Sequence, residues 1–136
     1  MQAAETGADI NMQQTRVNEL MADYANTPYA ALSALILAKQ QAQAGDNLKA
    51  IQQLEWVIKN SSAVELQNIA RLRMARLMMA TEQYDAAMTL LAAEYPESFT
   101  ALYEELKGDL HVLRGETDLA RAAYDNVWSK LPGRER

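Results

Sequence analysis

The fold is decided by residues 106–132, LKGDLHVLRGETDLARAAYDNVWSKLP. This stretch places Gly108 inside an apolar helical pattern, Gly115 seven residues later and Ala120 five residues after that. Two antiparallel helices need small residues where their backbones approach most closely. Glycine at the turn supplies the left-handed conformation that ends the first helix. The stretch therefore predicts a pair of antiparallel helices.

The same pattern occurs twice earlier in the chain. The first small position is occupied by Ala38, Ala75 and Gly108, at spacings of 37 and 33 residues. A helix-turn-helix repeat of the tetratricopeptide type has a period of about 34 residues. The repeats are degenerate, since only the third has a closing proline, Pro132. Three other positions follow in phase. The second small residue is Ala50, Ala87 and Ala120 in the three repeats, and the turn residue is Gly45, Glu82 and Gly115. The large packing residue is Leu54, Leu91 and Tyr124.

These patterns predict an all-α protein, a tetratricopeptide-like helical solenoid with three degenerate helix pairs preceded by one N-terminal helix. The composition agrees, because the 136 residues include only five Gly and three Pro. We expect a single domain, residues 1–136, with a leading helix in residues 1–26 and helix pairs in residues 28–60, 62–94 and 97–131. The individual helices are expected at residues 5–24, 28–44, 46–59, 63–80, 84–93, 97–114 and 117–130.

The sequence offers little that could carry out catalysis. It has no cysteine, and its one histidine, His111, has no serine-based motif around it, so we expect a packing or surface role. Glu105 and Asp109 share a helix face and could bind a cation weakly, but a catalytic pair needs a pocket and perturbed pKa values. We predict no enzyme activity, no metal site and no cofactor.

Charge and hydropathy exclude two further classes of partner. The formal net charge is −5 and the pI is about 4.9, so the overall field opposes nucleic-acid binding. No apolar run approaches the roughly 18–20 residues that span a bilayer, and the N-terminal sequence MQAAETGADINMQQ is too polar for a signal peptide. We therefore expect a protein partner, and contact with a membrane only through a segment that this chain does not contain.

The first helices of the pairs indicate where a partner would bind. In a solenoid of this type they line the concave side, and here that lining is mostly apolar. Exposed apolar surface of this extent usually marks a binding site, so a helix or an extended peptide could lie there. Alternatively, the leading helix fills the groove, or a second copy covers it in a homodimer. The expected partner contacts are Leu35, Lys39, Ile69, Leu72, Arg76, Met79 and Asp109.

Three separated motifs, in order along the chain, resemble a known family. They are TPYAALSALILAKQ at residues 27–40, LRMARL at residues 72–77, and ELKGDL with GETDLARAAY at residues 105–124. The family is the ancillary SecYEG translocon subunit family, or YfgM-like proteins, and the resemblance covers about residues 17–131.

The resemblance implies a function and a location. Family members carry a short cytoplasmic tail, one transmembrane helix and a tetratricopeptide-like domain in the periplasm. They associate with the SecYEG translocon and with a membrane-anchored chaperone of the prolyl-isomerase type. The chain would then be a protein-binding module at the bacterial inner membrane, facing the periplasm, that helps to pass translocating chains to chaperones. No catalytic residue carries over.

Two other functions remain open at this point. The chain could be a scaffold or regulator that sequesters a cytoplasmic signalling protein, in which case the domain would face the cytoplasm. It could instead belong to an outer-membrane assembly lipoprotein of similar repeat type, which would require a lipobox cysteine upstream.

Overall fold

The described part of the protein is built from seven α-helices and one short 3-10 helix. In a computed structural model, residues 2–131 are described, with side chains from residue 9 onward, and these residues contain no strand. This confirms the all-α prediction, and every expected helix boundary lies within three residues of the observed one. Pro132 and the residues after it lie outside the described part. The elements are α1 (Gln2–Asp23), α2 (Pro28–Gln43), α3 (Asn47–Asn60), α4 (Val64–Ala80), α5 (Tyr84–Leu91), η1 (Glu97–Phe99), α6 (Thr100–Leu113) and α7 (Thr117–Lys130).

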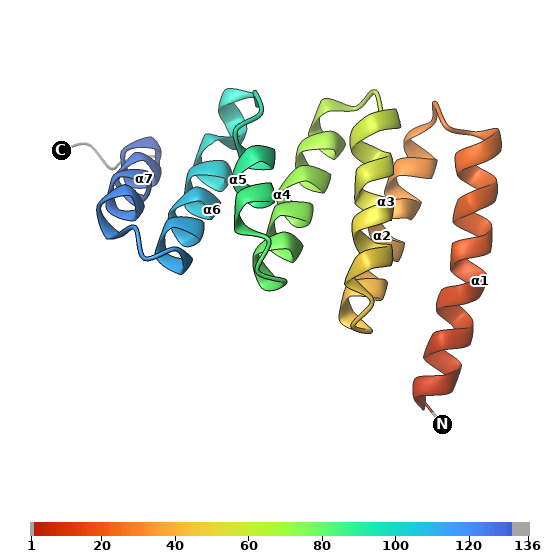
Figure 1. The fold of residues 1–136 in the computed structure, drawn as a ribbon. Helices are drawn as coiled ribbons and strands as arrows, with labels where there is room; N and C mark the ends of the chain where they lie inside the picture. The colour runs from red at the N-terminus through yellow and green to blue at the C-terminus, as the bar shows by residue number, and fades with distance from the viewer. Residues whose placement is uncertain (1, 132–136) are drawn as a thin grey trace. The chain divides into compact units, whose positions relative to one another are not determined.

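The chain divides into two compact units. The first comprises residues 1–71 and the second residues 72–136. Helices α1, α2 and α3 belong to the first unit, and α5, η1, α6 and α7 belong to the second (Figure 1). Helix α4 contributes its first half to one unit and its second half to the other. The assignment of residues 1–136 to a single domain stays a prediction.

The three turns between paired helices have the same backbone structure. Gly45, Glu82 and Gly115 all adopt positive φ angles, of 86°, 61° and 75°. In each turn this residue's N–H donates to a carbonyl three residues back, and the next N–H donates to a carbonyl five residues back. This is the Schellman arrangement that satisfies the last carbonyls of a helix. The turn positions predicted from the repeat phase are therefore confirmed, including Glu82, which holds a conformation that favours glycine.

Small residues lie where the paired helices approach each other. Ala38 and Ala75 are buried, and Gly108 is buried beneath the ring of Tyr124. A Cβ atom on Gly108 would lie 2.4 Å from Cε1 of Tyr124, much closer than a normal carbon–carbon contact. The third pair therefore combines the smallest residue at one position with the largest packing residue at the other.

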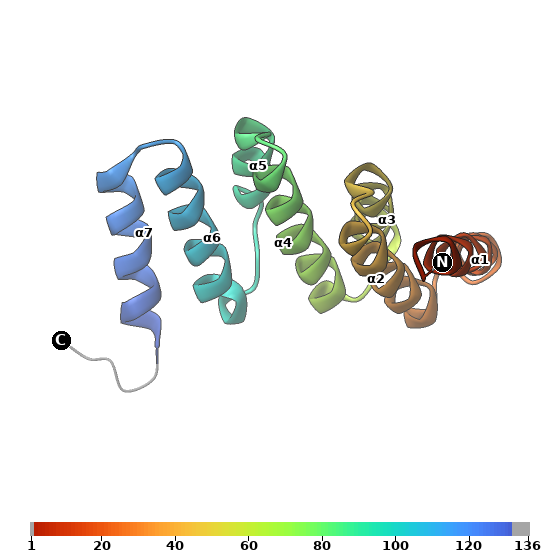
Figure 2. The ribbon, with the colours of Figure 1, turned by 90° about the horizontal axis from the view of Figure 1, so that it is seen from below.

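In the first unit, α1 packs beside α2 (Figure 2), and a glutamine hydrogen bond joins it to α3. Val17 is the one buried residue among the described side chains of α1. Oε1 of Gln14 accepts hydrogen bonds from Nε2 of Gln41 on α2 and Nε2 of Gln53 on α3, each 2.8 Å long. Gln41 and Gln53 are both buried. A shared amide acceptor thus joins three helices.

The core of the second unit joins α4, α5 and α6. Tyr95, in the segment before α6, stacks on Tyr103 with ring centroids 4.1 Å apart. Lys107 is half-buried, and its Nζ lies 5.5 Å from the Tyr95 ring centroid and 3.7 Å from a carboxylate oxygen of Glu104. The lysine is accommodated because an aromatic face and a carboxylate surround its ammonium group. The core cluster comprises Leu72, Ala75, Ala87, Leu91, Tyr103, Leu106 and Leu110.

Candidate functional site

The seven expected partner contacts have different degrees of exposure. Lys39 and Arg76 are exposed, whereas Ile69, Met79 and Asp109 are half-buried. Leu35 and Leu72 are only 4% and 5% exposed, so in this structure their side chains lie beneath the surface. Leu35, Lys39 and Ile69 lie in the first unit, and the other four lie in the second.

An exposed apolar stripe runs along α2 in the first unit. Tyr29 is 74% exposed and Ile36 is 59% exposed, and Leu32 and Lys39 are exposed as well. Positions i, i+3, i+7 and i+10 lie on one face of a helix, so these four residues form a continuous row, which we call the α2 stripe. Helix α1 leaves this stripe uncovered. Leu35 was expected to contact a partner, but it is buried, and its neighbour Ile36 is exposed on the stripe instead.

A shallow groove borders the α2 stripe. Ile36 and Leu37 of α2 form one side, and Val17, Leu20 and Arg16 of α1 form the other. The groove has a volume of about 230 Å³. Small-molecule sites are typically about 300–1,000 Å³ and more enclosed. The groove is therefore suited to single side chains of a partner that lies along α2.

In the second unit, α4 and α6 carry exposed residues of opposite charge. Arg73 and Arg76 on α4 are exposed, and so is Glu105 on α6. Asp109 on α6 accepts a 2.7 Å hydrogen bond from the Tyr124 hydroxyl. This hydrogen bond raises the pKa of Tyr124 to about 12, with further contributions from desolvation and from the charges of Asp109 and Glu105. The phenol therefore stays neutral and holds α7 against α6.

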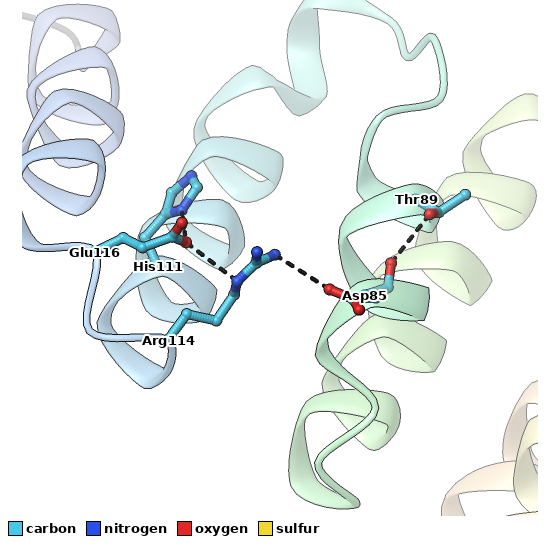
Figure 3. Close-up of polar contacts among 5 residues, drawn as sticks. All are labelled: Asp85, Thr89, His111, Arg114 and Glu116. Carbon is cyan, nitrogen blue, oxygen red and sulfur yellow. Dashed lines mark hydrogen bonds and ion pairs between the residues drawn. The ribbon is translucent and has the colours of Figure 1, made fainter.

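His111 belongs to a polar cluster at the turn between α6 and α7 (Figure 3). Its Nδ1 lies 3.1 Å from Oε1 of Glu116, which also lies 3.2 Å from Nε of Arg114. Arg114 reaches Asp85 at the start of α5, with 3.6 Å between the charged atoms. Arg114 thus links the start of α5 to the α6–α7 turn through an ion pair at the surface.

The described part of the chain offers no metal site and no membrane-spanning helix. It contains no group of three or more His, Cys, Asp or Glu residues that could hold a metal ion. Within residues 2–131, none of the helices combines the length and hydropathy that crossing a bilayer requires.

The chain is similar to proteins of one family. A family model described as a tetratricopeptide repeat-like domain matches residues 1–136. Three relatives are named ancillary SecYEG translocon subunit. The one from Escherichia coli (strain K12) is 32% identical over 97 residues, which are 71% of this chain and 47% of the relative.

The other two relatives are more distant. The protein from Neisseria gonorrhoeae (strain ATCC 700825 / FA 1090) is 25% identical over 132 residues, 97% of this chain and 63% of the relative. The protein from Buchnera aphidicola subsp. Acyrthosiphon pisum (strain APS) is 26% identical over 84 residues, 62% of this chain and 44% of the relative. The matched part thus spans about half the length of these relatives. No solved structure matches.

Proposed function

Because the chain belongs to the tetratricopeptide repeat-like domain family, we propose that it is a non-catalytic protein-binding module of the SecYEG translocon. The relatives' name supports the assignment to the translocon, since all three are called ancillary subunits of it. The observation that carries the proposal is the α2 stripe, an apolar row that the rest of the described chain leaves exposed. Contiguous exposed apolar surface of this kind often marks an interaction site.

The α2 stripe has the chemistry of a protein-binding surface. Tyr29 offers a large, rigid and amphipathic side chain, the type that dominates binding energy at interfaces. Full burial of a side chain such as Leu32 or Ile36 contributes about 1.5–3 kcal/mol. Lys39 at the end of the row would favour a partner segment with a carboxylate at its matching end. A helix or an extended segment can lie along such a row.

Other residues extend the proposed contact surface. We expect Lys39 and Ile69 in the first unit, and Arg76, Met79 and Asp109 in the second, to contact partners through their accessible atoms. Leu35 and Leu72 would act from beneath, by holding α2 and α4 in position. The opposite charges of Arg76 and Asp109 favour a partner that carries both signs.

The finer proposal concerns place and partners. The domain would face the periplasm at the bacterial inner membrane. There it would contact translocon subunits, a membrane-anchored chaperone of the prolyl-isomerase type, and translocating chains.

Site-specific photo-crosslinking in the producing bacterium tests this function. A photoreactive amino acid replaces Tyr29, and a matched control replaces Leu48, an exposed residue on α3 that lies outside the stripe. Crosslinks to translocon subunits or to a periplasmic chaperone from position 29, and their absence from position 48, are expected. Equal yields from both positions would show that the α2 stripe is not the binding surface.

The same experiment addresses the two other functions. Crosslinks from position 29 to cytoplasmic proteins alone would overturn the translocon proposal in favour of a regulator that sequesters a signalling protein. Crosslinks to outer-membrane assembly proteins alone would favour the lipoprotein function. A reporter enzyme fused after Arg136, active on only one side of the membrane, gives the topology independently.

A further inference from the structure

The last helix pair carries an apolar surface bordered by acidic residues. Val112 on α6 is 56% exposed, and Tyr124 and Trp128 on α7 lie one helical turn apart, both more than a third exposed. Glu105 and Asp109 lie on the same side of α6 as Val112. The hydrogen bond from Tyr124 to Asp109 places the residues of α7 beside those of α6. We call these five residues the α6–α7 face.

The preceding helix pair shows what covers a surface of this kind. One repeat earlier, Leu91 and Tyr95 occupy the positions of Tyr124 and Trp128. Leu91 is fully buried in the cluster with α6, and Tyr95 stacks on the Tyr103 ring. The covering helix presents one aromatic and two leucine side chains at i, i+3 and i+7: Tyr103, Leu106 and Leu110.

The α6–α7 face differs from that internal example in its charge. Glu105 occupies the position of the buried Leu72. A helix that covers the face must therefore bring a cation near Glu105 and Asp109, because a buried carboxylate without a partner is costly. The required partner is a helix with an aromatic residue, two aliphatic residues at i+3 and i+7, and a neighbouring basic residue.

The α2 stripe meets this description. Tyr29, Leu32 and Ile36 repeat the order and spacing of the residues by which α6 covers the preceding pair. Lys39 continues the row, and Arg16 lines the same groove as Ile36. We propose that the α6–α7 face of one copy of this chain binds the α2 stripe of a second copy.

The proposed contact is head-to-tail, since it joins two different surfaces, one from each unit. A head-to-tail contact gives a closed ring if the rotation between copies closes and a longer open assembly if it does not. Each surface offers only a few large side chains, which is typical of weak, transient association. This inference does not depend on the proposed function. Where both hold, self-association covers the α2 stripe and competes with the partner.

Sedimentation of the 136-residue chain tests the proposal. The average mass should rise above the 15.2 kDa of one chain as concentration approaches about 1 mM. Ile36→Asp and Val112→Asp each remove one surface at a side chain that is more than half exposed. Each variant alone should stay a monomer, but an equal mixture should form a dimer and nothing larger. Leu48→Asp, the matched control on α3, should assemble like the unaltered chain.

A second pair of variants tests the charge match independently. Lys39→Glu and Glu105→Lys should each weaken association, because each alone places two like charges at the contact. The mixture of the two should regain association, because the new carboxylate at position 39 of one chain then meets the new ammonium group at position 105 of the other. Circular dichroism confirms that each variant keeps its helices.

Three results would overturn the inference. The unaltered chain could stay a monomer throughout the concentration range. One of the two aspartate variants could assemble alone, which would mean that identical surfaces pair. The mixture of aspartate variants could fail to associate while the unaltered chain assembles.

Discussion

Alanine at position 108 should destabilise the last helix pair, although alanine favours helix more than glycine does. The added Cβ would lie 2.4 Å from Cε1 of Tyr124, where carbon atoms in contact are normally about 3.5–4.0 Å apart. The ring must therefore shift by about 1 Å, which strains its hydrogen bond to Asp109. Overpacking costs roughly 1–3 kcal/mol and the helix propensity of alanine offsets about 1 kcal/mol of it, so we expect a net loss of about 1 kcal/mol.

The same substitution should have the opposite effect once Tyr124 is replaced by leucine. The preceding pair already combines alanine and leucine at these positions, as Ala75 and Leu91 in one core cluster. In the Tyr124→Leu background, Gly108→Ala should therefore stabilise the protein by about 1 kcal/mol, the full difference in helix propensity. The two substitutions should thus be coupled by about 2 kcal/mol.

The assay is urea denaturation of the four chains in the double-mutant cycle. A Trp56→Phe background leaves Trp128 on α7 as the one tryptophan, so its fluorescence reports on the last helix pair. A coupling energy below about 0.5 kcal/mol, or destabilisation by Gly108→Ala in both backgrounds, would refute the reasoning. The first result would mean that the ring moves aside at negligible cost.

Three further predictions concern other contacts. Glu82→Gly should stabilise the protein by about 1 kcal/mol in urea denaturation, because glycine adopts the left-handed conformation without strain. Gly115→Ala should destabilise it by a similar amount, because alanine is strained at this positive φ. Nothing lies near the added Cβ, so the backbone strain acts alone. Gln14→Ala leaves two buried amides without their acceptor and should cost about 2 kcal/mol or more, seen as faster hydrogen exchange in α1, whereas the neighbouring Gln13→Ala should change it little. The pKa of Tyr124 is raised to about 12, so the stabilisation from its hydrogen bond to Asp109 is present below pH 10 and is lost as the pH rises through 12. In an ultraviolet titration, Tyr124→Phe should lack the ionisation step near pH 12 that the unaltered chain shows.

The repeat phase predicted the framework of the fold from a few positions. Gly45 and Gly115 indicated the first and third turns directly, because glycine adopts a left-handed conformation without strain. Glu82 has no such preference, and only its place in the repeat indicated a turn. Its positive φ confirms that the phase was correctly assigned.

The exposed surface was harder to predict. Leu35 and Ile36 are adjacent and both apolar, but one is buried and the other is on the α2 stripe. Periodicity identifies apolar positions on a helix, but it does not say which of two apolar sides meets another helix. The contact of α1 could not be predicted either, because glutamines are usually solvent-exposed, and nothing in the sequence indicated that Gln14 accepts hydrogen bonds from two buried amides.

The polar joint of α1 has a thermodynamic consequence. Val17 is the one buried residue among the described side chains of that helix, and Gln14 adds two hydrogen bonds to buried amides. Separation of α1 from α2 and α3 would therefore expose less apolar area than loss of α6, which buries Tyr103, Leu106 and Leu110. Heat capacity and denaturant sensitivity both scale with newly exposed surface, so detachment of α1 would give a weaker calorimetric signal than loss of α6. Competition for the hydrogen bonds of Gln14 would contribute to detachment as well.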